Sequence, residues 1–401
     1  MQIRCLFLLI LLVSAISCSP RRRGIRVVAV NKDGLFPDRV QSSLESALKW
    51  FENAVLVHDS YSDYVVDYVG KYVPGYQEPF AGRVTIQTPN KAFSLEILSD
   101  EFKTFFEYSD VVVFIRAKSF GCGTQPQAFG GSMRPKSPRL RASIPKLAFM
   151  EYCYNRVSDT FSYFDLFRHE ILHSLGYGVF EPEDSAMTVT EEKYQWKNED
   201  GTESTATRYF FNTSQVALNE VKNYFGCDSD NLKGVESDGG GMHLNEYIFQ
   251  NELMTPTLAE KNYFSYISAA ILENIYTGNA QWYMVNRTFI GPEADAYNFG
   301  KGFGCSWLLN SCYEFLEGRK NDNVPRPAPF CLEDSVQKCF KKSENELIAF
   351  SCELRDSGAA DNNIPRPLNT KYNVPSTRYC PIYPNYFENS KYELVDCQHQ
   401  K

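Results

Sequence analysis

The sequence predicts an α+β fold followed by a disulfide-rich, loop-rich C-terminal domain. Short runs of β-branched and other apolar residues predict buried strands, and longer segments carry apolar residues at helical spacing. Twelve cysteines are present, and seven of them follow residue 300. The length of 401 residues exceeds one ordinary hydrophobic core, so two or three domains are expected.

The first part of the chain is expected to alternate strands and helices. Residues 25–30 and 109–117 predict buried strands because valine and isoleucine dominate them. Residues 41–57 predict a helix, with apolar residues three or four positions apart. Residues 144–150 predict a further strand, and the stretch 125–143, rich in proline, glycine and arginine, predicts a loop.

Three more helices are expected further along the chain, at residues 161–175, 214–225 and 260–276. The first of them contains the most informative motif, because residues 169–176 read His-Glu-Ile-Leu-His-Ser-Leu-Gly. Gly176 is expected to end this helix in a left-handed backbone conformation, which glycine adopts at little cost.

Two histidines four positions apart on a helix lie on the same face, so His169 and His173 could bind one zinc ion. Zinc lowers the pKa of a bound water to about 7 and polarises a carbonyl, which makes it suited to amide hydrolysis. Glu170 lies between the histidines and is the candidate general base. A histidine pair alone is more often structural, so the surrounding sequence must decide.

Catalytic zinc usually has three protein ligands, so a third is needed. The chain contains five histidines, of which His58 and His399 carry no motif. His243 is the best candidate, because it follows a flexible Gly-Gly-Gly stretch that could bring a distant ligand back to the helix. Residues 252–256 follow it and read Glu-Leu-Met-Thr-Pro, which places Met254 in a predicted turn.

This arrangement resembles the leishmanolysin family of the metzincin peptidases, in which a methionine turn follows the third histidine. The family inserts a long segment before that histidine, as residues 177–242 do here. The resemblance implies a metzincin-type catalytic domain and one zinc ion per chain, with Met254 packed beneath the metal. Further stretches that resemble the family are Tyr-Phe-Gly-Cys-Asp at 224–228, Gly-Cys-Ser-Trp-Leu at 304–308 and Tyr-Cys-Pro at 379–381.

The resemblance has three further implications. It implies hydrolysis of proteins or peptides by an endopeptidase, with His169, His173 and His243 as the zinc ligands and Glu170 as the base. It implies a disulfide between Cys227 and Cys305. It also implies a sheet edge along the bound substrate, for which residues 144–150 are the candidate. The alternative is a cell-adhesion or binding protein built on a metallopeptidase scaffold, and the two functions could coexist.

The N-terminus predicts export. Arg4 precedes an apolar run at residues 5–13, and small residues follow, so residues 1–17 are expected to be a cleaved secretory signal. A signal anchor and a lipoprotein-type cleavage before Cys18 are the alternatives. The basic run at 21–23 is expected to solvate the new N-terminus, with a processing site as its alternative. The C-terminus carries no hydrophobic tail, so a glycolipid anchor is not expected, although a peripheral association with the cell surface is compatible.

Cysteine usage agrees with an oxidising compartment. Ten cysteines follow Cys18, which fits five disulfides, and two glycosylation sequons begin at Asn212 and Asn286. The formal net charge of −8 argues against a nucleic-acid partner. No cysteine lies between Cys18 and Cys122, so a cysteine-bearing inhibitory pro-segment is not expected, and the enzyme is predicted to be active on secretion.

The expected domain division follows from these points. It comprises the signal at 1–17, an N-terminal catalytic subdomain at 18–176, a central subdomain at 177–300 and the disulfide-rich domain at 301–401.

Overall fold

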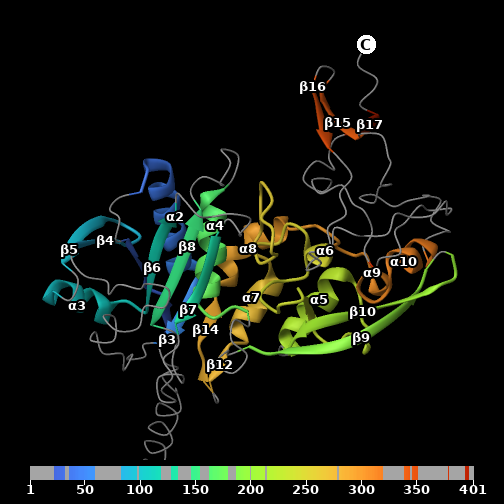
Figure 1. Ribbon diagram of the computed structural model, residues 1–401, viewed down its shortest axis with the longest axis horizontal. Helices are drawn as coiled ribbons and strands as arrows, with labels where there is room; N and C mark the ends of the chain where they lie inside the picture. The colour runs from blue at the N-terminus through green and yellow to red at the C-terminus, as the bar shows by residue number, and fades with distance from the viewer. Residues whose placement is uncertain are drawn as a thin grey trace, which may run out of the picture.

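A computed structural model shows a mixed α+β architecture (Figure 1). The predicted signal at 1–17 and His399 lie outside the residues that the structure describes. The described residues are 22–31, 36–58, 83–96, 99–118, 128–133, 146–153, 162–178, 187–198, 200–212, 215–277, 280–318, 338–343, 346–350, 378 and 393–396.

The largest sheet has six strands in the order β5-β4-β2-β6-β8-β7. Strands β2, β6 and β8 are parallel, whereas β4, β5 and β7 each run antiparallel to their neighbours. The bounds are β2 (Val27–Asn31), β4 (Arg83–Gln87), β5 (Ala92–Glu96), β6 (Val111–Lys118), β7 (Ala128–Met133) and β8 (Leu147–Cys153).

Both faces of this sheet are covered, because successive side chains of a strand point to opposite sides. Val113 of β6 faces the larger hydrophobic cluster together with α2 (Asp38–Ala54) and α4 (Tyr163–Ser174). Phe114 faces a smaller cluster that includes α3 (Asp100–Tyr108). The strands predicted at 25–30 and 109–117 are therefore present as β2 and β6.

The edge of the sheet differs from the expectation. β8 covers most of the predicted strand at 144–150, but it lies between β6 and β7 and is not an edge. The edge strand is β7, which lies within residues 125–143, predicted to be a loop. Its two adjacent glycines, Gly130 and Gly131, suggested a turn, whereas here they belong to a strand that packs closely against α4.

The first long helix ends earlier than predicted. α2 stops at Ala54, and β3 (Val55–His58) begins at the next residue. β3 pairs with β1 (Arg22–Gly24) on one side and β14 (Tyr283–Val285) on the other. Val55 matched the helical spacing, but its side chain is buried within this small sheet instead.

The predicted insert forms a separate three-stranded sheet in the order β11-β10-β9. Strands β9 (Val189–Lys197) and β10 (Glu203–Phe211) make a long hairpin, which Figure 1 shows at the opposite end of the molecule from β4 and β5. β11 spans Val235–Ser237. The helix predicted at 214–225 is confirmed as α5 (Gln215–Phe225). The hairpin itself was not predicted.

Shorter elements complete the described chain. The helix predicted at 260–276 is reduced to α7 (Tyr266–Glu273), because Ser265 caps its N-terminus and accepts a hydrogen bond from Ser268 N. The remaining elements are α6 (Glu246–Phe249), β12 (Tyr276–Thr277), β13 (Ala280–Gln281), α8 (Arg287–Ala296), α9 (Cys305–Leu309), α10 (Cys312–Gly318), β15 (Lys338–Ser343), β16 (Glu346–Phe350) and β17 (Glu393–Asp396).

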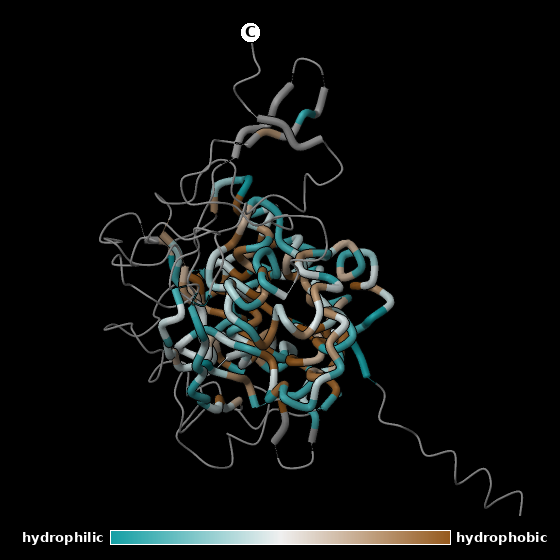
Figure 2. Tube along the Cα trace, turned by 90° about the vertical axis from the view of Figure 1, so that its right-hand side faces the viewer, coloured by the Kyte–Doolittle hydropathy of each residue, from teal (hydrophilic) through white to brown (hydrophobic). Residues whose placement is uncertain are grey.

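The larger hydrophobic cluster contains buried apolar residues from Ile25 to Leu316, and Figure 2 shows hydrophobic segments running through the middle of the packed body. Within the described ranges, no helix has the length and apolar character needed to cross a membrane.

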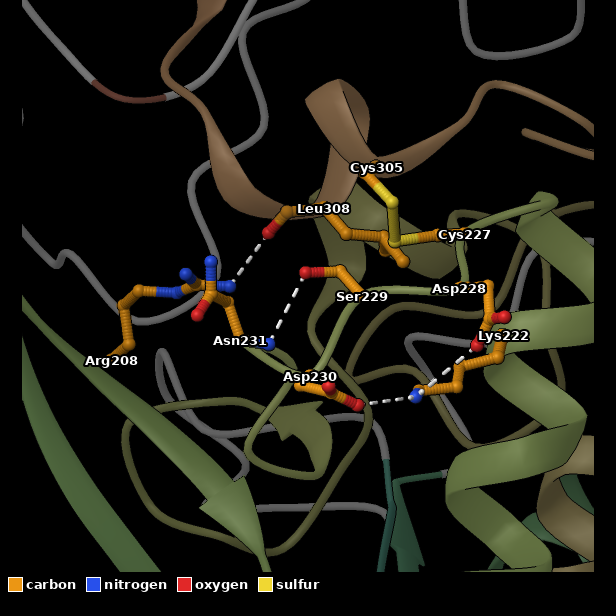
Figure 3. Close-up of a disulfide and its surroundings, with 9 residues drawn as sticks. All are labelled: Arg208, Lys222, Cys227, Asp228, Ser229, Asp230, Asn231, Cys305 and Leu308. Carbon is orange, nitrogen blue, oxygen red and sulfur yellow. Dashed lines mark hydrogen bonds and ion pairs between the residues drawn. A yellow bond between two sulfur atoms is a disulfide. The ribbon is translucent and has the colours of Figure 1, made fainter.

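The cysteines within the described residues are all disulfide-bonded. The pair implied by the family resemblance, Cys227 and Cys305, is present and joins the end of α5 to the start of α9 (Figure 3). Cys153, Cys312 and Cys339 are also bonded, and the other five predicted disulfide cysteines lie outside the described residues.

Candidate metal centre

Helix α4 carries the histidine motif in the centre of the molecule. Ser162 caps its N-terminus by accepting a hydrogen bond from Asp165 N at 3.2 Å. Gly176 has a φ of +97° and follows the last helical turn, as the sequence predicts. Each side chain of α4 except Phe164 is buried, so the motif faces protein and not bulk solvent.

The structure brings the three predicted ligands together. The candidate ligand atoms of His169, His173 and His243 all lie within 4.8 Å of one another. The Nε2 atoms of His169 and His173 are 3.0 Å apart. His58, which has no motif, lies on β3 and is not part of this group.

Each ligand ring is oriented through its other nitrogen. When Nδ1 donates its proton to an oxygen, Nε2 carries the free lone pair that a metal requires. The Nδ1 atoms lie 2.7 Å from Leu253 O for His169, 2.9 Å from Tyr177 O for His173 and 2.8 Å from Asp238 Oδ2 for His243.

This donor set fits zinc. Three imidazoles whose Nδ1 atoms each contact an oxygen supply the nitrogen ligands that zinc prefers and leave a further coordination position available. Burial, followed by the neighbouring His243, lowers the pKa of His169 to about 3, so this ring is neutral at pH 7. Burial likewise lowers the pKa of His173.

Glu170 lies on the same helix and is 4% exposed. Burial raises the pKa of its carboxyl group to about 8, while a hydrogen bond from the backbone N–H of Gly130 acts in the opposite direction. Gly130 belongs to edge strand β7, and a Cβ atom there would lie 2.8 Å from Glu170 Oε2. Close packing of β7 on α4 therefore places the sheet edge beside Glu170.

The turn around Met254 contacts His169, the first candidate ligand. Met254 is fully buried, and its carbonyl accepts a hydrogen bond from Leu244 N at 2.9 Å. Leu253, the preceding residue, supplies the carbonyl that orients His169. Met254 thus lies in a turn that contacts both the helix ligand and the segment after the third ligand.

The leishmanolysin peptidase family profile matches residues 142–366, more than half of the chain. The chain belongs to the leishmanolysin family. Peptidases of this family are zinc-dependent, which agrees with the three-histidine donor set.

Curated leishmanolysin relatives are similar over part of their length. A leishmanolysin-like peptidase of Drosophila pseudoobscura pseudoobscura is 28% identical over 185 residues, which are 37% of this chain and 25% of the relative. One of Caenorhabditis elegans is 23% identical over 278 residues, covering 57% and 40% respectively. Leishmanolysin of Leishmania major is 26% identical over 169 residues, covering 41% and 24%. The matched regions thus span about a quarter to two fifths of these relatives.

Two buried carboxylates of this leishmanolysin-family site were not predicted. Asp238 Oδ1 accepts hydrogen bonds from Met242 N at 3.0 Å and His243 N at 3.3 Å, while Oδ2 contacts the His243 ring. Asp238 therefore fixes both the backbone and the ring of the third ligand. An aspartate directly before three glycines is a typical turn former, and this feature could have identified it.

Glu252 is the second unpredicted carboxylate and is fully buried. It accepts hydrogen bonds from Met254 N at 2.6 Å, Ser265 N at 3.0 Å and Ser265 Oγ at 2.8 Å. These bonds hold the leishmanolysin methionine turn against the start of α7. Burial raises the pKa of Glu252 despite the hydrogen bonds from Met254 and Ser265.

An ion-pair network anchors the active-site helix. Arg168 is 2% exposed and donates to Asp165 at 2.5 Å and Glu293 at 2.7 Å. Asn262 Nδ2 also donates to Asp165, at 3.2 Å, and Phe264 N donates to Glu293 at 2.8 Å. The network joins α4 to α8 and to the segment after the methionine turn, which limits rotation of the helix.

Proposed function

We propose that this chain is a secreted zinc-dependent endopeptidase that hydrolyses peptide bonds in proteins or peptides. The convergence of three oriented histidine Nε2 atoms beside Glu170 carries this proposal. The family match supports the same activity, since the similar proteins of Drosophila and Caenorhabditis are named peptidases.

In this proposal, His169, His173 and His243 hold one zinc ion. Zinc, when bound, would lower the pKa of a coordinated water to about 7 and polarise the substrate carbonyl. Glu170 takes a proton from the attacking water and delivers it to the leaving amine nitrogen. Met254 supports the ligands and does not contact the substrate.

The substrate is proposed to lie along β7 in an extended conformation. Among the described strands β7 pairs only with β8, so its other edge has backbone groups available for an added strand. The N–H of Gly130 contacts Glu170, so a peptide on this edge would pass close to the general base. In this proposal the edge strand along the substrate is β7, and not the strand predicted at residues 144–150.

Secretion rests on the predicted signal at 1–17 and on the disulfides. All described cysteines are bonded, and disulfides persist mainly in oxidising compartments. Asn212 is exposed and is the better candidate for glycosylation. Asn286 instead caps α8, and its amide nitrogen donates to Asn53 O at 3.1 Å.

The test compares the secreted protein with Glu170→Ala and with Glu191→Ala, a control at an exposed position on β9. Hydrolysis of casein and of a quenched peptide is measured together with zinc content. We expect zinc in all three proteins, activity in the parent and the control, and a loss of at least about a hundredfold in Glu170→Ala. Zinc without activity in the parent would favour the binding-scaffold alternative, and a folded parent without zinc would contradict the metal site.

A further inference from the structure

A buried charge cluster lies behind the loop that carries the third histidine. Its centre is Glu236 on β11, which is 5% exposed. Arg208 of β10 donates to Glu236 Oε2 at 2.6 Å, and Arg378 donates to the same oxygen at 2.8 Å. A second nitrogen of Arg378 contacts Oε1, so this arginine binds the carboxylate through two nitrogens.

Glu236 is connected to residues that precede and follow His243 in the sequence. Two residues after Glu236 comes Asp238, which orients the His243 ring. Two residues after His243 comes Asn245, whose N–H donates to Glu236 O at 3.1 Å and whose amide donates to Glu236 Oε1 at 3.2 Å. The backbone and the carboxylate of one residue therefore hold both ends of the ligand loop.

Arg378 reaches this cluster from a part of the chain 142 residues away from Glu236. Its carbonyl accepts a hydrogen bond from Cys312 N at 2.8 Å, so its backbone is fixed at the start of α10. Arg208 makes a parallel link, because it also donates to Leu308 O at 2.7 Å in α9 (Figure 3). Both links join the ligand loop to the chain after residue 301.

The charges explain why the cluster is rigid. Burial alone would raise the pKa of Glu236, but Arg378 and then Arg208 outweigh burial and hold this pKa below its usual value. Both guanidinium groups also lie over the ring of Tyr194, at 5.6 Å for Arg378 and 5.3 Å for Arg208. A buried carboxylate held by two fixed cations has little freedom to move.

We propose that Arg378 is a positioning residue for the third zinc ligand, acting through Glu236 on the loop that contains Asp238 and His243. Zinc affinity in the catalytic part then depends on a residue of the C-terminal part. The inference deepens the proposed function and rests on zinc binding by the three histidines.

The test replaces Arg378 with methionine and with lysine. In Arg378→Met the carboxylate keeps Arg208 as its partner, so no unpaired charge is left behind. The matched control is Arg23→Met, which removes another arginine that binds a carboxylate through two nitrogens, in this case Asp110 just before β6. Zinc dissociation constants are measured by chelator competition at a temperature where all variants are folded, and cobalt-substituted proteins are compared by their visible spectra.

We expect the dissociation constant of Arg378→Met to rise about tenfold, the lower end of the effect of outer partners of metal ligands. The cobalt spectrum should change with it, Arg378→Lys should recover part of the affinity, and Arg23→Met should match the parent. A lower melting temperature of Arg378→Met with parental affinity and spectrum would show that Arg378 only fastens the C-terminal part, and would overturn the proposal.

If Arg378→Met does not fold, Arg378→Lys decides the question, because it keeps one donor and loses the two-nitrogen grip. Parental zinc affinity in Arg378→Lys would then overturn the proposal, and a raised dissociation constant would support it. A folded parent that binds no zinc is a different result, since it contradicts the zinc site itself and, with it, the basis of this inference.

Discussion

Asp238 binds the loop of the third candidate ligand through both of its carboxylate oxygens. It uses one carboxylate oxygen for two backbone N–H groups and the other for the His243 ring. No side chain that offers only one acceptor oxygen can replace it in both roles. The orientation of His243 therefore depends on Asp238, which is not itself a candidate ligand.

Replacing Asp238 with asparagine should weaken zinc binding by about 10- to 100-fold, because an amide can serve either the ring or the backbone but not both. Chelator competition measures the effect. Asp200→Asn is the matched control, since Asp200 Oδ1 accepts from Thr202 N at 2.9 Å in an equivalent turn at the exposed end of the hairpin. Equal zinc affinity in the two variants would contradict this role.

At the scale of single residues, the sequence predicts the candidate ligands and the candidate base but not the residues that orient them. The spacing of His169 and His173 follows from helix geometry, and Glu170 is adjacent to the first of them. Glu252 could not be assigned, because its partner Ser265 is defined only once the methionine turn closes onto α7. A glutamate in an apolar turn is nevertheless unusual. Here Glu252 is fully buried, and its carboxylate accepts hydrogen bonds from Met254 and Ser265.

In the proposed mechanism, strand β7 and helix α4 bring the substrate and the general base together. Gly130 permits their contact, since a Cβ atom at this position would lie 2.6 Å from the backbone oxygen of Glu170. Real Cβ atoms do not approach a carbonyl oxygen so closely, so any larger residue must displace the strand or the helix.

Gly130→Ala should therefore lower kcat/KM on the order of a hundredfold, as expected when reacting groups are misplaced by about an ångström. Zinc content should stay at the parental level, because the ligands are not touched. Gly318→Ala is the control, since a Cβ atom there meets nothing within 4 Å. Parental activity in Gly130→Ala would show that β7 does not have to pack so tightly.

Elements with a clear period were predictable, and elements set by distant contacts were not. The helices α4 and α5 match their predicted ranges closely because their apolar spacing is regular. β7 was missed because adjacent glycines usually indicate a turn, and only packing against α4 makes them suitable in a strand. The β9–β10 hairpin was missed although its strands alternate, because its outward face is strongly polar.

The larger of the two hydrophobic clusters joins elements from distant parts of the described chain. It runs from Ile25 to Leu316 and crosses the boundaries predicted at residues 176 and 300. Those boundaries remain a prediction about how the chain is organised. The candidate metal centre combines residues from both sides of the first boundary, since His169 precedes residue 176 and His243 follows it.

Ion pairs to Asp110 hold the first described segment of the chain against the rest of the fold. The sequence suggested that the basic run at 21–23 is a solvated terminal segment, but Arg22 and Arg23 belong to β1. Arg23 donates to both oxygens of Asp110, at 2.5 Å and 2.7 Å, and Arg26 N donates at 2.7 Å. Burial would raise the pKa of Asp110, but these hydrogen bonds outweigh it and lower the pKa below its ordinary value.

A lowered folded-state pKa stabilises the protein above the unfolded pKa and stops doing so as the pH falls through the folded value. The free energy of unfolding of the parent protein should therefore exceed that of Asp110→Asn at pH 7. This difference should shrink below about pH 4. Urea titrations at several pH values measure it. Asp230→Asn, at a fully exposed side chain, should show no such trend. A difference independent of pH would contradict the assignment.

Cys227 and Cys305 are 78 positions apart in the sequence, and His243 lies inside the loop that their bond closes. A protease that cuts the loop once would therefore not release a fragment. Both pieces would migrate as one species on a gel until a reductant was added, and the third ligand would stay attached to the enzyme. A single nick between these cysteines would thus escape detection by size under non-reducing conditions.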